Sequence, residues 1–262
     1  MKKKKQGISM IVTIIIVSIV IICIGLIVYF LFNKNSSKKD GNSSNSLETQ
    51  ESVGKTSDGV AKPEDYRTST INENEKTISI DTCENKDAKI CDIPSKIDGE
   101  TVVSIRSKAL AGKQNLEEVI VPGTVEKIGE FAFFLNSKLK KVTLNEGVKE
   151  IGKKCFSQDT ALVEVSLPST LKTITSYAFV YCPSLEKITI PEGVENIELG
   201  AFARCEKLNE VHIPNSVTTI QQVNSDVDSG VFEKSPNVTI YAPKGSYAEK
   251  YAKQENIKFV AE

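Results

Sequence analysis

The first place to look for reaction chemistry is His212, the only histidine in the chain. A hydrolytic site needs a nucleophile, a base and an orienting carboxylate, and Thr189, His212 and Glu210 supply these three groups. A 23-residue interval separates Thr189 from His212, and Glu210 lies two positions before the histidine. Similar hydroxyls and carboxylates recur in the same pattern without a histidine, so we expect no catalytic site. A single histidine also excludes a multi-histidine metal site.

Cysteines are the second candidate chemistry, because five of the six lie outside the apolar N-terminal stretch. Cys83 and Cys91 lie in an irregular segment, and a disulfide between them is the oxidation we expect if that segment is extracellular. Cys155 takes a position that alanine holds in neighbouring repeats, which indicates a packed core thiol. The same 23-residue interval separates Cys182 from Cys205, and stacking would also bring them within disulfide range.

The insertion Asn224–Gly230 resembles a calcium loop in part. Oxygen-bearing side chains alternate at its first residue, at Asp226 and at Asp228, as calcium ligands do. The glycine that ends the insertion comes one place late, and Ser235 stands where a bidentate glutamate is required. A solvated loop that could carry recognition is therefore the default interpretation. We expect no metal and no cofactor.

A 23-residue repeat positions these groups. Seven columns keep the same phase over about a hundred residues, and such regularity does not arise by chance. Proline follows the third column in most units, and asparagine replaces it once. The clearest columns are Leu116, Leu139, Leu162, Leu185 and Leu208; Val119, Val142, Val165, Ile188 and Val211; Ile128, Ile151, Ile174, Ile197 and Ile220; and Phe133, Phe156, Phe179 and Phe202.

The repeat predicts a solenoid. A 23-residue unit cannot bury its own apolar side, so the units must stack to form a continuous core. The period-2 alternation after each leucine predicts a short strand, and the following proline ends the ladder because it lacks a donor. Equivalent strands would run parallel and in register about 4.8 Å apart. We therefore expect a repeat solenoid with short parallel strands and a cap at each end.

The unit from Leu185 to Phe202, LEKITIPEGVENIELGAF, resembles the BspA-type leucine-rich repeat of bacterial surface proteins. The resemblance covers about residues 64–262 and is specific for the fold. It implies adhesion or protein binding without a shared catalytic site. It also implies a ladder of side chains that bond backbone groups of the turns, at Asn136, Asp159, Cys182 and Cys205.

Two columns point away from the predicted core. The first alternates in charge over five coils, and the second is mostly small and polar and suits an extended ligand. The charged column has two interpretations: a stripe that binds a protein of mixed charge, or a ladder of weak ion pairs that fixes register. We favour the ladder. The candidate interaction surface comprises Glu118, Lys141, Glu164, Lys187 and Glu210, with Thr143, Ser166, Thr189 and His212.

Residues 9–32 carry no charge and are long enough for a helix that crosses a bilayer. A cleaved signal would have a shorter core and end in small residues, unlike Tyr29–Phe32. Lysines at positions 2–5 favour a cytoplasmic N-terminus, with the bulk of the chain outside. We therefore expect a single-pass protein in the plasma membrane of a bacterium of Gram-positive type.

Six segments follow from these patterns. Residues 33–63 contain one large aliphatic residue and no aromatic residue, so we expect them to form a disordered tether. Near the C-terminus, Ser246 as N-cap and Glu249 predict a short helix, with Tyr247 and Tyr251 covering the last coil. The segments are 1–8, cytoplasmic tail; 9–32, transmembrane helix; 33–63, disordered linker; 64–115, N-terminal cap and degenerate first repeat; 116–237, repeats; and 238–262, C-terminal cap.

The formal charge of -1 averages two different regions. Residues 1–63 hold 9 basic and 4 acidic side chains, which leaves 24 basic and 30 acidic side chains in residues 64–262. An acidic domain makes nucleic acid an unfavourable partner. The sequence thus favours a membrane-anchored, extracellular repeat protein that binds a protein partner or mediates adhesion. A structural spacer in a surface assembly is the alternative, and an enzyme is less favoured.

Overall fold

The computed structural model describes residues 59–221 and 230–262. The segments 1–8 and 9–32, most of the linker, and residues 222–229 of the calcium-like insertion lie outside the described residues. Predictions for those segments therefore stay predictions. Within the described ranges, no helix is long and apolar enough to cross a membrane.

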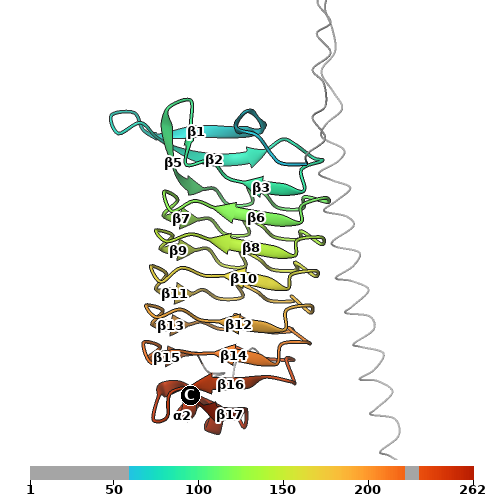
Figure 1. Cartoon of the computed structure of the whole chain (residues 1–262), viewed down its shortest axis with the longest axis vertical. Coiled ribbons are helices and arrows are strands. Elements are labelled where there is room, and N and C mark those ends of the chain that lie inside the picture. Colours follow the sequence, from blue (N-terminus) through green and yellow to red (C-terminus); the bar gives the residue numbers. More distant parts are fainter. Residues whose placement is uncertain (1–58, 222–229) are drawn as a thin grey trace, which may run out of the picture. The chain divides into compact units, whose positions relative to one another are not determined.

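The described chain winds into a solenoid of stacked coils, which confirms the predicted architecture (Figure 1). Each regular coil contributes one strand of three or four residues and a second strand of two residues. The longer strands are β6 (Glu118–Val121), β8 (Lys141–Leu144), β10 (Glu164–Ser166), β12 (Lys187–Thr189), β14 (Glu210–His212) and β16 (Thr239–Ala242). The short strands are β7 (Lys127–Ile128), β9 (Glu150–Ile151), β11 (Thr173–Ile174), β13 (Asn196–Ile197) and β15 (Thr219–Ile220).

The N-terminal end departs from the repeat. The strands β1 and β2 form an antiparallel hairpin, and β2 then pairs in parallel with β5. The strand β3 pairs in parallel with β6, and β4 pairs antiparallel with β5. The elements there are the 3-10 helix η1 (Pro63–Asp65), β1 (Tyr66–Asn72), β2 (Thr77–Cys83), β3 (Ile90–Asp92), β4 (Lys96–Ile97) and β5 (Glu100–Ile105).

Parallel pairing in register joins most successive coils, as the 23-residue spacing requires. The longer strands form two sheets, in the orders β10-β8-β6-β3 and β12-β14-β16-β17, where β17 is Lys258–Ala261. The other strands also form two sheets: β1-β2-β5-β7-β9, to which β4 adds, and β11-β13-β15. Each ladder is therefore interrupted once, between β10 and β12 and between β9 and β11. The predicted parallel pairing in register therefore holds within each sheet but not across these two junctions, and a groove described below lies at the break before β11.

Stacked phenylalanines form the centre of the core. The rings of Phe133, Phe156, Phe179 and Phe202 are fully buried and nearly parallel, with successive centroids 5.2 to 5.5 Å apart. Phe232 continues the stack at 5.9 Å, although the insertion separates it from the regular phase. Each ring thus covers the next, so a coil without neighbours would expose its largest apolar side chain.

Side chains at one turn position form a second ladder, here called the turn ladder: Asn136, Asp159, Cys182, Cys205 and Ser235. The Asn136 amide nitrogen Nδ2 donates to the carbonyl of Leu110 at 3.0 Å. Cys182 and Cys205 thiols donate to the carbonyls of Phe156 and Phe179, both at 3.2 Å. The resemblance to the BspA type implied these bonds, and the structure confirms them for the asparagine and the two cysteines.

The helix α2 (Tyr247–Gln254) and the strand β17 (Lys258–Ala261) end the described chain. Ser246 Oγ accepts the Glu249 amide at 3.2 Å, as predicted, but Glu249 Oε2 accepts the Gly245 amide rather than that of Ser246. The buried stripe of α2 comprises Ala248, Tyr251 and Ala252. Tyr247 lies at the edge of that stripe and is 37% exposed. Only one of the two predicted tyrosines therefore covers the last coil.

Candidate interaction surface

The charged column predicted from the sequence lies on the outward face of the longer strands. The register places Lys141 opposite Glu118 on one side and Glu164 on the other. In the next sheet Lys187 is opposite Glu210. The structure therefore brings these five residues onto one face, but in two segments, because no strand pairing joins β10 to β12 in the described chain.

Ion pairs occupy most of this charged column. The Lys141 ammonium lies 3.7 Å from a Glu118 oxygen and 3.4 Å from a Glu164 oxygen. The Lys187 ammonium contacts Glu210 directly. Hydrogen bonds from Lys187 and from His212 lower the pKa of the Glu210 carboxyl. These contacts match the interpretation of the column as a ladder of exposed ion pairs, which individually add little stability.

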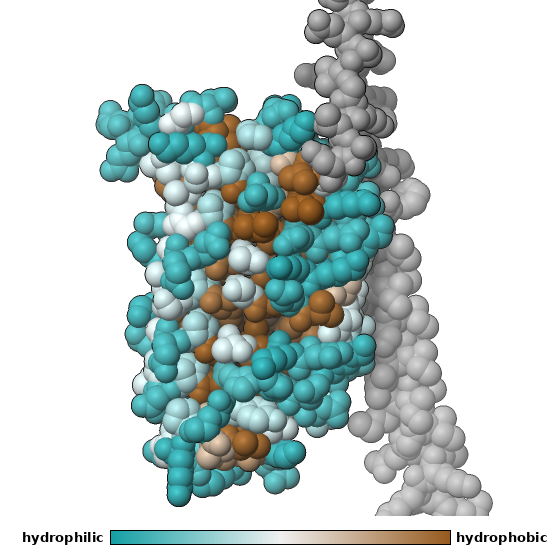
Figure 2. Space-filling model, in the orientation of Figure 1, coloured by the Kyte–Doolittle hydropathy of each residue, from teal (hydrophilic) through white to brown (hydrophobic). Residues whose placement is uncertain are grey.

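The second outward column differs from the first because its three hydroxyl groups are unpaired within the described residues, whereas its histidine is paired. The hydroxyls of Thr143, Ser166 and Thr189 bond to no residue in the described parts of the chain, and Ser166 and Thr189 are exposed. On the visible face, hydrophilic side chains line both margins of the stack, and apolar residues form only a broken strip between them (Figure 2). That face therefore lacks the broad apolar patch of a permanent interface.

His212 lies between two carboxylates. Its Nε2 is 2.7 Å from Glu210 Oε1, and its Nδ1 is 2.6 Å from Glu262 Oε1. The ring also stacks on Tyr241, with centroids 4.9 Å apart. Although Thr189 is the register neighbour of His212, neither ring nitrogen is left to take a proton from its hydroxyl. The arrangement therefore differs from a nucleophile and base pair.

Cys83 and Cys91 are buried and both thiols are free. They lie beside each other, at the end of β2 and in β3. A hydrogen bond from the Cys91 thiol lowers the pKa of Cys83, and the same bond together with burial raises the pKa of Cys91. The two thiols are close enough to hydrogen-bond, and the bridge itself stays a prediction.

The other three cysteines of the described residues, Cys155, Cys182 and Cys205, are also buried free thiols. Burial raises the pKa of Cys155 and of Cys182, and it raises the pKa of Cys205 to about 12. Such thiols are poor nucleophiles because the thiolate is the reactive form. No group of three or more metal-binding side chains occurs within residues 59–221 and 230–262.

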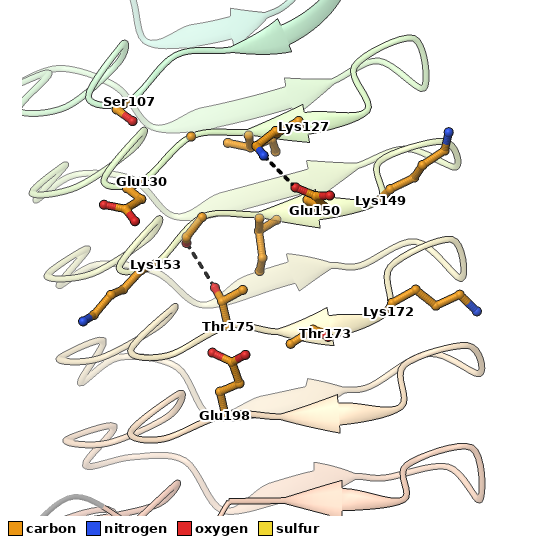
Figure 3. A pocket seen from close by; sticks show the side chains of 14 residues that line it. Ser107, Lys127, Glu130, Lys149, Glu150, Lys153, Lys172, Thr173, Thr175 and Glu198 are labelled. Atoms are coloured by element: carbon orange, nitrogen blue, oxygen red, sulfur yellow. Dashed lines mark hydrogen bonds and ion pairs between the residues drawn. The ribbon is translucent and has the colours of Figure 1, made fainter.

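A groove of about 710 Å3 lies on another side of the solenoid, across β7, β9 and β11 (Figure 3). No pattern in the sequence predicted this groove. Its lining is mainly lysine, glutamate and glycine, and one ion pair joins Lys127 to Glu150 at 2.9 Å. Residues that line it include Lys149, Gly152, Lys153, Lys172 and Thr175.

An alternating column of cations and aromatic rings was also missed. The Lys154 ammonium lies 5.6 Å from the ring centres of both Phe131 and Tyr177, and the Lys108 ammonium lies 6.0 Å from Phe131. These four residues follow one another at 23-residue intervals in the sequence. Because lysines alternate with aromatic residues, they do not form an apolar column that the repeat pattern would reveal. Contacts of this kind stabilise neighbouring coils.

Comparison with known proteins fixes the family. A family model described as the BspA-type leucine-rich repeat region matches residues 103–239, with 6 copies. This match spans more than half of the chain. The chain belongs to the BspA-type leucine-rich repeat family.

Solved structures share the fold. A leucine-rich repeat protein of T. pallidum is 24% identical, with a TM-score of 0.63, over 75% of this chain and 96% of its own. A leucine-rich cell surface protein of Faecalibacterium prausnitzii is 26% identical, with a TM-score of 0.53, over 68% of this chain. The match spans 53% of that second protein. None of the curated proteins matches this BspA-type chain.

Proposed function

We propose that this BspA-type protein binds a protein partner at the cell surface through the outward face of β6, β8, β10, β12 and β14. The observation that carries the proposal is the unequal use of the two outward columns. The charges pair with one another, whereas the hydroxyls of Thr143, Ser166 and Thr189 have no partner among the described residues. Hydroxyls on a rigid, regularly spaced face can bond an extended partner without ordering cost in the receptor.

Localisation is part of the proposal. The uncharged stretch 9–32 would anchor the chain as a single transmembrane helix, and the linker 33–63 would hold the repeat domain outside the cell. A cell-surface relative from Faecalibacterium prausnitzii supports this location. Protease added to intact cells should remove the repeat domain, and protection of residues 64–262 would contradict this topology.

Binding is tested with the full chain in detergent, used to capture proteins from host and bacterial surface extracts. Ser166→Arg with Thr189→Arg should abolish capture, because two large cations would cover the hydroxyls. Lys141→Ala with Lys187→Ala should preserve capture, because those ammonium groups are already paired. Thr218→Arg is the matched control, because Thr218 is exposed and directly precedes β15, outside the proposed surface. Capture of nothing at all by the folded chain would favour a spacer instead.

A further inference from the structure

The groove across β7, β9 and β11 lies at a break in the solenoid ladder. The strand β9 pairs with β7, and β11 pairs with β13, but no pairing joins β9 to β11 in the described part of the chain. Figure 3 shows the groove lined by side chains from consecutive coils on either side of this break.

Backbone acceptors show what the break leaves unused. The Glu126 carbonyl accepts the amides of Lys149 and Glu150, at 2.9 and 3.1 Å. One coil beyond the break, the Lys172 carbonyl accepts the Glu195 amide at 2.9 Å. The Lys149 carbonyl holds the equivalent position between them, yet it accepts no amide from the next coil within residues 59–221 and 230–262. It remains available on one wall of the groove.

Backbone donors on the opposite wall are equally unused. In the coil before the break, the Gly152 amide donates to the Ile128 carbonyl at 2.8 Å. The Thr175 amide is its equivalent one coil later, but it donates to no carbonyl of the described chain, Ile151 included. The Thr175 hydroxyl crosses the gap and donates to the Gly152 carbonyl at 3.1 Å. On either side of the gap the coils are also joined, by the Thr170 hydroxyl to the Val148 carbonyl at 2.8 Å and by the Lys154 amide to the Ser176 carbonyl at 3.2 Å. Between these bonds the groove presents one unpaired amide and one unpaired carbonyl of the described chain.

Like charges face each other at the break. Lys149 and Lys172 hold the same position in consecutive coils and lie one above the other beside the groove (Figure 3). Each lysine pairs away from the gap: Lys149 with Glu126 at 2.9 Å, and Lys172 with Glu195 at 3.5 Å. Like charges at facing positions destabilise strand pairing. At this position like charges face each other across the junction, whereas opposite charges face each other across the junctions on either side.

Glycines keep the floor of the groove low. Gly129 and Gly152 line it in consecutive coils and contribute no side chain. A Cβ atom at Gly129 would collide with the backbone of Ser107, and one at Gly152 would collide with the backbone of Glu130. These coils therefore approach closely only with glycine, and an extended chain could reach the backbone groups of the walls.

We propose that this groove binds an acidic polypeptide segment in extended conformation. A carboxylate of the segment lies between Lys149 and Lys172, and its backbone bonds to the Thr175 amide and the Lys149 carbonyl. A polypeptide supplies donors and acceptors at strand spacing, as in β-strand addition, whereas an anionic polysaccharide satisfies only the lysines. The inference rests on the proposed function because both describe a protein-binding domain, but it assigns a different face.

A charge swap tests the proposal without altering composition. In the full chain in detergent, Lys172→Glu with Glu195→Lys restores alternating charge along the column and should close the gap. The probe is a fluorescent decapeptide that alternates threonine and glutamate, with a threonine–lysine decapeptide and an oligogalacturonate for comparison. Glu117→Lys with Lys140→Glu is the matched control, because it reverses a 2.8 Å ion pair outside the groove.

The expected result is anisotropy-detected binding of the acidic peptide that falls at least about tenfold in the swap variant and is unchanged in the control. Hydrogen exchange at the Thr175 amide should slow when the peptide binds. Equal binding of the basic peptide, unchanged affinity in the swap variant, or binding of oligogalacturonate alone would overturn the proposal. If the acidic peptide fails while extract capture still depends on Ser166 and Thr189, only this inference fails.

Discussion

The backbone amide of Asn136 donates to Asp159 Oδ1 at 2.8 Å, while Asp159 Oδ2 has no hydrogen-bond partner within the described residues. Both side chains are fully buried in the turn ladder. Other members of that ladder donate to a carbonyl of the preceding coil, as Asn136, Cys182 and Cys205 do. A carboxylate cannot donate, so Asp159 can match them only in its protonated form.

Asp159→Asn is therefore expected to stabilise the protein near neutral pH by about 1 to 3 kcal/mol, since its amide donates without first having to take up a proton. Burial raises the pKa of Asp159 well above its usual range. The folded state thus holds a proton that the unfolded chain releases near pH 3.9, so stability should fall as pH rises above about 4. Urea unfolding across pH would show this fall in the wild type and its loss in the variant.

Removing one ring from the phenylalanine stack tests how strongly neighbouring coils depend on each other. Phe179 is fully buried between Phe156 and Phe202, at 5.3 and 5.5 Å. Phe179→Ala should cost about 3 to 5 kcal/mol, because the change removes buried surface and leaves a cavity. Tyr181→Ala, at a position that is 44% exposed in the same coil, should change the unfolding free energy by less than about 0.5 kcal/mol. Similar effects of the two substitutions would argue against a continuous core.

The charged column makes a separate prediction. Lys141→Ala with Lys187→Ala should lower the melting temperature slightly at low salt, because it removes contacts to Glu118, Glu164 and Glu210. The loss should shrink at high salt, since these exposed pairs are screened. Scanning calorimetry at two salt concentrations measures both effects. A salt-independent loss would mean that packing of the lysine stems, rather than charge, supports the column.

Features that recur with the 23-residue period were accessible from the sequence, and features that break the period were not. Equivalent positions stack, so the outward column from Glu118 to Glu210 and the buried place of Cys155 followed from spacing alone. The contact between His212 and Glu262 joins residues 50 apart, outside any column. The sequence shows Lys149 and Lys172 as like charges at equivalent positions of consecutive units. Only the structure shows that the ladder is interrupted there, between β9 and β11.

Cys83 and Cys91 carry the last prediction. Both thiols are buried, and the hydrogen bond from Cys91 lowers the pKa of Cys83, which favours its thiolate as the attacking group. Reaction with oxidised glutathione should form one intramolecular disulfide and release two molecules of reduced glutathione. The bridge would close a loop of about nine residues and stabilise the fold by about 2 to 3 kcal/mol.

Cys83→Ser should abolish both the loss of two hydrogens in the intact mass and the gain in stability. Cys182→Ser is the matched control, because its buried thiol has a raised pKa and donates to the Phe156 carbonyl. An oxidised sample that keeps five alkylatable thiols outside residues 9–32 after unfolding would show that the pair does not bridge.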